Sequence, residues 1–597
     1  MISKYGYLLL LILMPFASYA QNSVPEWAKG AVWYQIFPER FRNGNPNNDP
    51  IKEHVVGDVD FDWQVHPWAS DWYKFQIWEE ARGEDFYTVV FDRRYGGDLL
   101  GVLEKLRYLK DLGVDAIYFN PIFEAPSLHK YDAETYHHID NNFGYDRDGD
   151  RLAIESEKED PSKWSVTQAD QVFFDLIAKA HDMDIKIVID GVFNHCGRQF
   201  WAFKDVVANQ DSSAYKDWFD VIRWDDPATP DTNEFDYKGW WGFKSLPEFK
   251  EDADGLVAPV KKYFFDITRR WMDPNGDGDP SDGIDGWRLD VVQDVNPKFW
   301  EAWYKFVKSI NPNAYTVGEI WEEAADWISH HRFDAVMNYP LAKLMVQFFI
   351  DRRNKISVAK FDRELKRLRG LYPATTNAVL MNLIDSHDTD RLASMIKNPD
   401  RNYDRQAGVR DSKQYDPTKP NADERKIQKL IAIFQMTYVG APMVYYGDEA
   451  GMWGGDDPDD RKPMLWQEFT YEKESYDRVR PDIKRQDENI FDPALFEHYK
   501  KLIKIRHENP ALQRGNFVTR LVDNKRGLYG FSRKFEDNVV FVVLNNSSSK
   551  QVFEYATLWQ NKTRVKDVLN DKHYVVENGT LKLSIGKKWA VVLVKGK

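Results

Sequence analysis

The sequence has only one cysteine, Cys196, among its 597 residues, so no disulfide bond can form within the chain. Basic residues are outnumbered, with 81 Lys and Arg against 95 Asp and Glu, and the net charge of −14 argues against nucleic acid as a partner. A neutral polymer remains compatible with this charge. Long apolar runs are missing after the N-terminus, so we expect no membrane span in the mature chain. A large core, with or without bound cations, must therefore supply the stability.

The N-terminus has the three parts of an export signal. Lys4 precedes an apolar run from Tyr5 to Phe16, which is too short to cross a bilayer comfortably, and small residues follow up to Ala20. This pattern predicts a signal peptide over residues 1–20, cleaved after Ala20. We therefore expect an exported protein that is periplasmic or secreted.

Aromatic residues are abundant, at 15% of the chain with 22 Trp and 30 Tyr. Carbohydrate clefts use flat rings to stack against the C–H faces of sugars, although large cores also consume aromatic residues. Four of the tryptophans fall in an insertion over residues 55–95, which is compatible with a roof over a cleft or with packing on the main domain.

Apolar strands alternate with amphipathic helices along most of the chain. Strands are predicted at 31–38, 116–121, 185–195, 284–290, 314–321, 378–388 and 440–449, and helices at 99–113, 168–182 and 259–272. This alternation predicts an α/β fold, a (β/α)8 TIM barrel with a small excursion after the third strand. Short alternating strands after 510 predict a C-terminal all-β sandwich domain. The predicted units are the signal peptide 1–20, the barrel 21–195 and 259–509, the excursion 196–258 and the sandwich 510–597.

Polar residues follow the C-terminal ends of several of these strands. They are Asp190, Asn194 and His195, then Arg288 and Asp290, then Glu319, then His387 and Asp388, with Tyr131 and Asp132 after an earlier strand. One Arg and Asp at a strand end can be an ordinary ion pair, but strand ends of a barrel converge on one face, so the series predicts a shared pocket. Arg288 is expected to keep Asp290 ionised. Paired carboxyl groups beside aromatic rings suit the cleavage of glycosidic bonds.

Three loops carry oxygen donors. Asn43, Asn45, Asn48 and Asp49 are spaced so that either a Ca²⁺ loop or an ordinary turn would fit. Residues 146–150 and 273–279 also contain alternate acidic residues, and both are compatible with a cation site or with a solvated turn.

The ordered motifs Asp190-Gly-Val-Phe-Asn194-His195, Gly286-Trp-Arg288-Leu-Asp290, Gly318-Glu319-Ile-Trp and Ser386-His387-Asp388 resemble the α-amylase family of retaining glycoside hydrolases. The resemblance covers nearly all of the mature chain. It implies that Asp290 is the nucleophile, Glu319 the general acid/base and Asp388 the carboxylate that stabilises the transition state. It further implies substrate binding by a larger set of residues: Tyr131, Asp132, His195, Arg288, His387, Trp241, Trp321 and Arg391.

Within the family the chain is most similar to the neopullulanase and cyclomaltodextrinase group, through Ser127-Leu-His-Lys-Tyr131-Asp132, Trp240-Trp241-Gly-Phe and Gly455-Asp-Asp-Pro-Asp-Asp-Arg461. This resemblance implies a Ca²⁺ cofactor held by Asn43, Asn45, Asn48, Asp49, Gly96 and Asp98. The N-terminal dimerising domain of many such enzymes is missing, which favours a monomer. Leu246–Lys250 and Val291–Asp294 depart from the group's usual residues where acceptor sugars would bind.

These features predict a secreted endo-type hydrolase of α-1,4 bonds in starch-like α-glucans, with pullulan, maltooligosaccharides and cyclodextrins as candidate substrates. An α-glucan transferase or an α-glucosidase on short oligosaccharides would use the same carboxyl groups. A non-catalytic starch-binding relative is disfavoured because Asp290, Glu319 and Asp388 are all retained.

Overall fold

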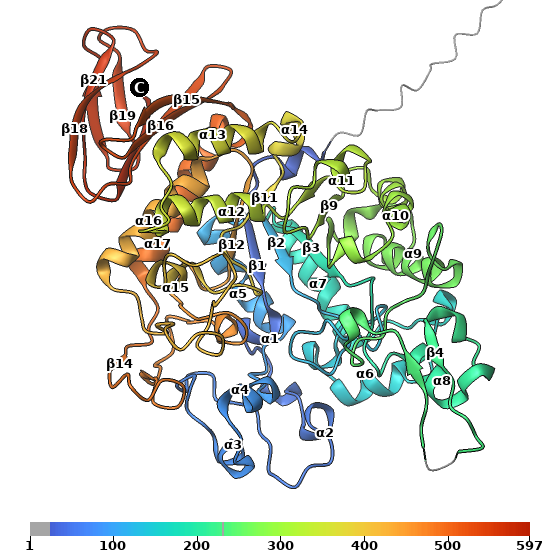
Figure 1. Cartoon of the computed structure of the whole chain (residues 1–597). Helices are drawn as coiled ribbons and strands as arrows, with labels where there is room; N and C mark the ends of the chain where they lie inside the picture. Colours follow the sequence, from blue (N-terminus) through green and yellow to red (C-terminus); the bar gives the residue numbers. More distant parts are fainter. Residues whose placement is uncertain (1–23, 230–231, 597) are drawn as a thin grey trace, which may run out of the picture.

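The computed structural model of the protein describes residues 24–229 and 232–596 (Figure 1). The predicted signal peptide lies outside these residues. None of the helices in the described ranges combines the length and the apolar character that a bilayer crossing requires.

Eight parallel strands form the central sheet, in the order β10-β9-β8-β3-β2-β1-β12-β11. A parallel bridge between Met337 and Met381 joins the two edges, so the sheet closes into a barrel. The strands are β1 (Trp33–Ile36), β2 (Ala116–Phe119), β3 (Lys186–Gly191), β8 (Gly286–Leu289), β9 (Tyr315–Gly318), β10 (Ala335–Val336), β11 (Met381–Asn382) and β12 (Ala441–Tyr445). The predicted barrel is confirmed. Only β10 was missed, because Ala335 and Val336 lie between Asp334 and Asn338 and so belong to no long apolar run.

Amphipathic helices surround the barrel. Helix α5 (Leu99–Leu112) begins at Asp98, whose side chain accepts from the N–H of Gly101, and ends at Gly113 with φ 99°. The other helices of seven or more residues are α6 (Arg147–Ile154), α7 (Gln168–Asp182), α8 (Trp201–Asn209), α9 (Ala258–Met272), α10 (Pro297–Ile310), α12 (Tyr339–Met345), α13 (Val358–Arg369), α16 (Ala422–Thr437) and α17 (Pro493–His507). The polar stretch from 398 to 421 has no regular element.

The excursion after β3 contains α8 and two small antiparallel pairs, β4 (Val221–Arg223) with β5 (Asp236–Tyr237) and β6 (Glu251–Asp252) with β7 (Gly255–Leu256). A bridge between His195 and Glu248 ties the far end of this segment back to the end of β3. The excursion therefore stands beside the carboxyl ends of the strands, as the green segment in Figure 1 shows.

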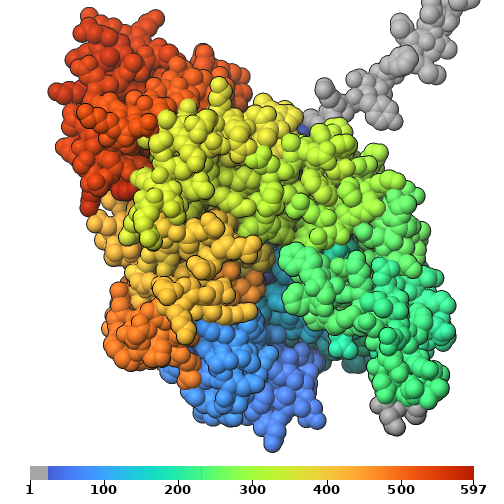
Figure 2. Space-filling view, in the orientation of Figure 1, coloured from blue at the N-terminus to red at the C-terminus, as the bar shows by residue number. Residues whose placement is uncertain are grey.

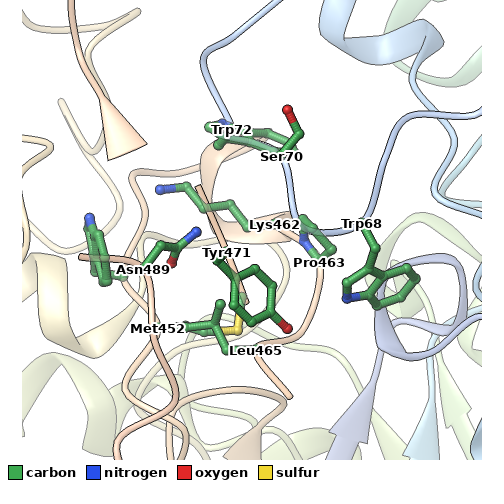
Figure 3. A pocket seen from close by; sticks show the side chains of 10 residues that line it. Trp68, Ser70, Trp72, Met452, Lys462, Pro463, Leu465, Tyr471 and Asn489 are labelled. Atoms are coloured by element: carbon green, nitrogen blue, oxygen red, sulfur yellow. The ribbon is translucent and has the colours of Figure 1, made fainter. Parts of the chain in front are cut away.

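The Trp-rich insertion follows the short helix α2 (Lys52–Val55) and contains the short helices α3 (Ile77–Arg82) and α4 (Phe86–Val89). It has a core of its own, in which Trp63, Trp72 and Trp78 are buried. The insertion packs on the segment 452–489 around a small cavity of about 10 Å³, where Trp68 and Trp72 face Lys462 and Tyr471 (Figure 3). Of the two roles left open by the sequence, packing on the barrel is therefore the one observed.

Two antiparallel sheets form the C-terminal domain, coloured red in Figure 1. The larger has the order β15-β16-β17-β22-β19-β20 and the smaller pairs β18 (Gln551–Ala556) with β21 (Thr580–Ile585). The larger sheet comprises β15 (Asn516–Asp523), β16 (Leu528–Phe535), β17 (Asn538–Asn545), β19 (Arg564–Asp567), β20 (Lys572–Val575) and β22 (Trp589–Lys595). An apolar core that includes Phe541, Leu583 and Leu593 lies between the sheets, so the predicted sandwich is confirmed. The boundaries drawn at 196, 258 and 510 stay predictions.

Candidate active site

A cleft of about 1280 Å³ opens at the carboxyl ends of the barrel strands. Asp290, Glu319 and Asp388 all line it, together with side chains of the excursion and of the segment 401–405. In Figure 2 the surface is hollowed between the green excursion and the yellow and orange parts of the barrel. The topology thus brings the three acidic residues, 98 positions apart in sequence from first to last, to one cavity.

Arg288 is the centre of the charged floor. Its Nη1 donates to Asp190 at 2.9 Å and to Asp290 at 2.9 Å, and its Nη2 lies 3.0 Å from Oε2 of Glu319. Arg288 is fully buried on β8, between β3, which ends near Asp190, and β9, which precedes Glu319. One guanidinium therefore fixes three carboxyl groups relative to one another.

A second network holds the wall beside Asp190. The hydroxyls of Tyr118 and Tyr131 donate to Asp190 Oδ2 at 2.8 and 2.9 Å. The ring of His387 stacks on that of Tyr131, with ring centres 5.5 Å apart, and its Nε2 lies 2.6 Å from the Tyr131 hydroxyl. The amide of Gln35 lies 3.0 Å from Nδ1 of His387, which favours the neutral ring with its proton on Nε2.

Glu319 is oriented by two donors in addition to Arg288. The backbone N–H of Val291 donates to Oε2 at 3.2 Å, and Nε1 of Trp321 donates to Oε1 at 2.9 Å. Trp321 is itself held in a stack on Tyr339, with ring centres 3.9 Å apart. The predicted residue Trp321 therefore positions the acid as well as lining the cleft.

Asp388 lies between two basic groups. Its Oδ1 is 3.3 Å from Nη2 of Arg461 and its Oδ2 is 3.2 Å from Nε2 of His387. Burial and the nearby Glu319 raise the pKa of Asp388 to about 7, while Arg461 opposes the shift. Burial also lowers the pKa of His387, so this ring supplies no permanent charge.

Burial raises the pKa of Asp290 well above its usual range; Arg288 opposes this shift, and Glu319 and Asp190 add to it. Arg288 therefore favours the ionised form of Asp290, as expected, but desolvation has the larger effect on this pKa. Four carboxyl groups surround two guanidinium groups in this cluster, and the titrations of such neighbours are linked. Asp190, Asp290 and Asp388 each have a raised pKa, so these three carboxyl groups hold their protons more tightly than free carboxyl groups would.

Aromatic rings lead from the buried floor toward solvent. His195 stacks on Trp240 with ring centres 5.0 Å apart, and Trp240 stacks on Trp241 at 4.9 Å. Nε1 of Trp240 donates to Asp294 at 2.8 Å, which anchors the stack to the loop after β8. Trp241 is 75% exposed and lines the cleft as predicted. Asn194 lies behind the stack, with its amide 3.1 Å from Nδ1 of His195.

Four of the eight residues predicted to bind substrate do not line the cleft. Arg288 and His387 are buried directly behind residues that line it, whereas Asp132 and Arg391 lie elsewhere. Asp132 is not among the residues that line the cleft, and its carboxylate accepts from the hydroxyl of Ser127. Arg391 is fully buried, and its guanidinium donates to the carbonyls of Asp460 and Tyr446. Asp132 ends one motif and Arg391 closely follows another, but the chain turns after the strand end and directs these side chains into the protein.

Some residues of the site had no role assigned from the sequence, among them Gln35, Trp240 and Arg461. A signal was present for each of these three. Gln35 is a polar residue inside an apolar strand, where a buried amide needs a partner. Trp240 and Arg461 stand in passages that carried the family resemblance.

Some of the predicted Ca²⁺ ligands fit a cation site better than others. Nδ2 of Asn43 donates to Asp49 at 2.7 Å, and the buried Oδ1 of Asn43 has no partner among the described residues. A Cβ atom at Gly96 would lie 2.1 Å from Oδ1 of Asp49, so only glycine fits there. Burial raises the pKa of Asp49 to about 7.

The other predicted ligands already have partners. Asp98 accepts from the backbone N–H groups of Gly44 and Asn45, Oδ1 of Asn45 accepts from the N–H of Asn47, and Oδ1 of Asn48 accepts from that of Arg147. Their oxygens retain further lone pairs, so Asn43 and Asp49 would supply the free positions of a hard-cation site.

The two other acidic loops are built as turns and caps. Asp146 begins α6 and accepts from the N–H of Gly149, while Asp150 accepts from two N–H groups at the start of α7. The solvated loop expected at 146–150 is therefore a helix start. In the segment 273–279, Asn275 and Asp277 each accept from a backbone N–H two residues on.

A closed (β/α)8 barrel with carboxyl groups facing one another at the carboxyl ends of its strands defines the class of barrel glycoside hydrolases. The description "Alpha amylase, catalytic domain" matches residues 35–160 and 168–515, and the chain belongs to the alpha-amylase family of glycoside hydrolases.

Relatives place the chain near one group of that family, as predicted. Neopullulanase 2 of Thermoactinomyces vulgaris is 37% identical over 96% of this chain and 79% of that protein. A cyclomaltodextrinase of Thermoanaerobacter pseudethanolicus is 34% identical over 88% of this chain and 72% of that protein. Among solved structures, cyclic alpha-maltosyl-(1→6)-maltose hydrolase from Arthrobacter globiformis superimposes with a TM-score of 0.68 at 27% identity, covering 96% of this chain and 100% of that one.

Proposed function

We propose that the protein hydrolyses α-1,4-glucosidic bonds within starch-like α-glucans by double displacement. One observation carries this proposal: Asp290 and Glu319 contact the two terminal nitrogens of a single guanidinium and face the same cleft. The cleft of about 1280 Å³ is larger than the roughly 300–1,000 Å³ of a site for one small molecule, which suits several sugar units of a polymer.

Each step has a residue placed to perform it. The carboxylate of Asp290 attacks the anomeric carbon while Glu319 gives its proton to the departing glycosidic oxygen, so a glycosyl ester forms and the aglycone leaves as an alcohol. Glu319, now ionised, takes a proton from water, whose oxygen attacks the same carbon and releases Asp290. Asp388, held by Arg461, accepts hydrogen bonds from sugar hydroxyls.

The Trp240 and Trp241 stack supports a second outcome of the same intermediate. An apolar platform at the open end of the cleft can hold an acceptor sugar, which would replace water in the second step. Transfer to an added sugar is therefore the second candidate, together with the release of glucose from short oligosaccharides. The relatives named neopullulanase and cyclomaltodextrinase also motivate pullulan and cyclodextrins as substrates.

We further propose that the mature protein is exported. The N-terminal sequence supports export. A Ca²⁺ ion would be held by Asn43 and Asp49 with the surrounding carbonyls, and its chemistry there is structural, because neither of these residues lines the cleft.

The test is sugar release from soluble starch by the wild type and by Glu319→Gln, which keeps the size of the side chain and removes the proton donor. We expect a loss of at least about 10³-fold. Equal, negligible release by both proteins would favour a binding module instead. NMR of the first product should show the α anomer, since two displacements retain configuration; a β anomer contradicts the role of Asp290. The products from pullulan then show whether pullulan is a substrate. The products from starch with added glucose show whether the intermediate reacts with water or with an acceptor sugar.

A further inference from the structure

Two adjacent histidines and a glutamate lie together outside the cleft. His137 and His138 are in the loop after β2, and Glu157 is in the segment between α6 and α7. They are 1%, 0% and 8% exposed, respectively. One nitrogen of each ring and one carboxylate oxygen all lie within 4.8 Å of one another.

The spacing of these three atoms suits a small metal ion. Oε2 of Glu157 is 2.9 Å from Nε2 of His138 and 3.8 Å from Nε2 of His137. Ligands at about 2.0–2.1 Å from a tetrahedral Zn²⁺ stand roughly 3.3 Å apart, a value between these two distances. A small movement of one ring would make both distances equal.

The outer nitrogens of both rings are already engaged, as they are in protein zinc sites. Nδ1 of His138 lies 2.8 Å from Asp170, and Nδ1 of His137 lies 2.8 Å from the hydroxyl of Tyr263. Proton donation by each Nδ1 to these partners leaves a lone pair on each Nε2, and both Nε2 atoms lie near Oε2 of Glu157. The other oxygen of Glu157 accepts from the N–H and the hydroxyl of Ser165 at 2.9 and 2.7 Å.

We propose that His137, His138 and Glu157 bind a structural Zn²⁺ ion. Two imidazoles and a carboxylate favour Zn²⁺ over Ca²⁺, which prefers oxygen ligands, so this site differs in chemistry from the one predicted at Asn43 and Asp49. None of the three residues lines the catalytic cleft. Their burial leaves no room for a substrate and assigns the ion a structural role, with water as the fourth ligand.

The ion would connect parts of the chain that are distant in sequence. Trp164 stacks on His137 with ring centres 4.4 Å apart, and Arg270 of α9 donates to Asp170 at 2.9 Å. Zinc binding would thus fasten the loop after β2 and the segment around Glu157 to α7 and α9, on the flank of the barrel that carries Tyr131.

The same heavy atoms also suit a metal-free arrangement, in which a protonated His138 bridges Glu157 and Asp170. Metal content decides between the two. The mature protein, produced without a histidine tag, is equilibrated with Zn²⁺ in the presence of excess Ca²⁺, separated from free metal and analysed for zinc. We expect about one Zn²⁺ per chain. His137→Gln and Glu157→Gln should each lose it, whereas starch hydrolysis by the wild type should not depend on it.

His330→Gln is the matched control, because His330 is an exposed histidine whose Nδ1 lies 3.3 Å from Asp326; it should keep the zinc. Co²⁺ provides a readout that does not need folded variants: at this site it should give the intense visible bands of tetrahedral coordination in the wild type, and Zn²⁺ should abolish them. A wild type without zinc and without these bands, or a His137→Gln variant that retains the ion, would overturn the proposal.

Discussion

The backbone N–H of Val291 donates to Oε2 of Glu319 at 3.2 Å, from a residue whose φ is 38°. The left-handed region is unfavourable for a β-branched side chain, and such strain costs about 1–3 kcal/mol. Val291 directly follows Asp290, so the strained turn directs an N–H at one acid from the residue next to the other. Strain at this position therefore serves to orient the acidic pair.

Val291→Gly tests this relationship. Glycine adopts φ 38° without steric cost and keeps the N–H, but it adds conformational entropy to the unfolded chain, so we expect the free energy of unfolding to rise by no more than about 1 kcal/mol. Starch hydrolysis should stay within about 3-fold of the wild type. Denaturant unfolding and initial rates measure both quantities. Val291→Pro is the contrast, because it lacks the N–H and cannot adopt this φ; if it were as active as Val291→Gly, the N–H would have no role.

Ionisation of Asp388 should make the stability of the folded protein depend on pH. Its pKa is raised to about 7, so its ionisation above that pH opposes folding, whereas below the ordinary pKa of about 3.9 it is neutral in both states. The folded state thus loses stability from this group as pH rises from about 4 to 7. We expect Asp388→Asn to be inactive and more stable than the wild type by about 1–2 kcal/mol at pH 8, with the difference falling toward zero near pH 4. Melting temperatures of both proteins across this range measure the effect, and a stability difference independent of pH would contradict it.

Removal of Ca²⁺ should destabilise the protein through Asn43 and Asp49. A ligand present at 100 times its Kd contributes about 2.7 kcal/mol, so a chelator should lower the melting temperature of a chain of this size by roughly 2–3 °C. The melting temperature of Asp49→Asn should equal that of the chelator-treated wild type, whether or not chelator is present. Asn47→Ala, on an exposed side chain two residues earlier, should respond like the wild type. Elemental analysis that finds no calcium, with no change on chelation, would rule the site out.

The sequence predicted most of the barrel because its strands are buried on both faces and give continuous apolar runs. It also predicted that Asp290 and Glu319 meet, since parallel strands bring their ends to one face. Side-chain direction beyond a strand end follows no such rule, which is why Arg391 and Asp132 were misplaced. Spacing along a single segment also could not group His137 with Glu157, because their approach depends on how the loop folds back toward α7.

Arg391→Lys tests whether Arg391 has a structural role rather than a substrate-binding role. Its guanidinium donates to the carbonyls of Asp460 and Tyr446 at 2.8 and 2.7 Å and is fully buried. Lysine cannot make both bonds, and each charged hydrogen bond contributes about 1.5–3 kcal/mol, so Arg391→Lys should lose about 3 kcal/mol of stability. KM for starch should stay within about 2-fold of the wild type at a temperature where the variant is folded. A large rise in KM with unchanged stability would instead restore the substrate-binding role that the sequence suggested.

Trp241 should contribute to binding and little to stability. Its side chain is 75% exposed and rests on Trp240, so Trp241→Ala removes a sugar platform without opening a cavity. Stacking contributes about 0.5–1.5 kcal/mol, which predicts a fall of roughly 2- to 12-fold in kcat/KM for long glucans. Transfer to an added acceptor sugar should fall more than hydrolysis, because water needs no platform. Tyr145→Ala removes another exposed aromatic ring, 62% exposed and outside the cleft, and should change neither activity. Equal losses of transfer and hydrolysis in Trp241→Ala would place the ring on the donor side of the scissile bond rather than on the acceptor side.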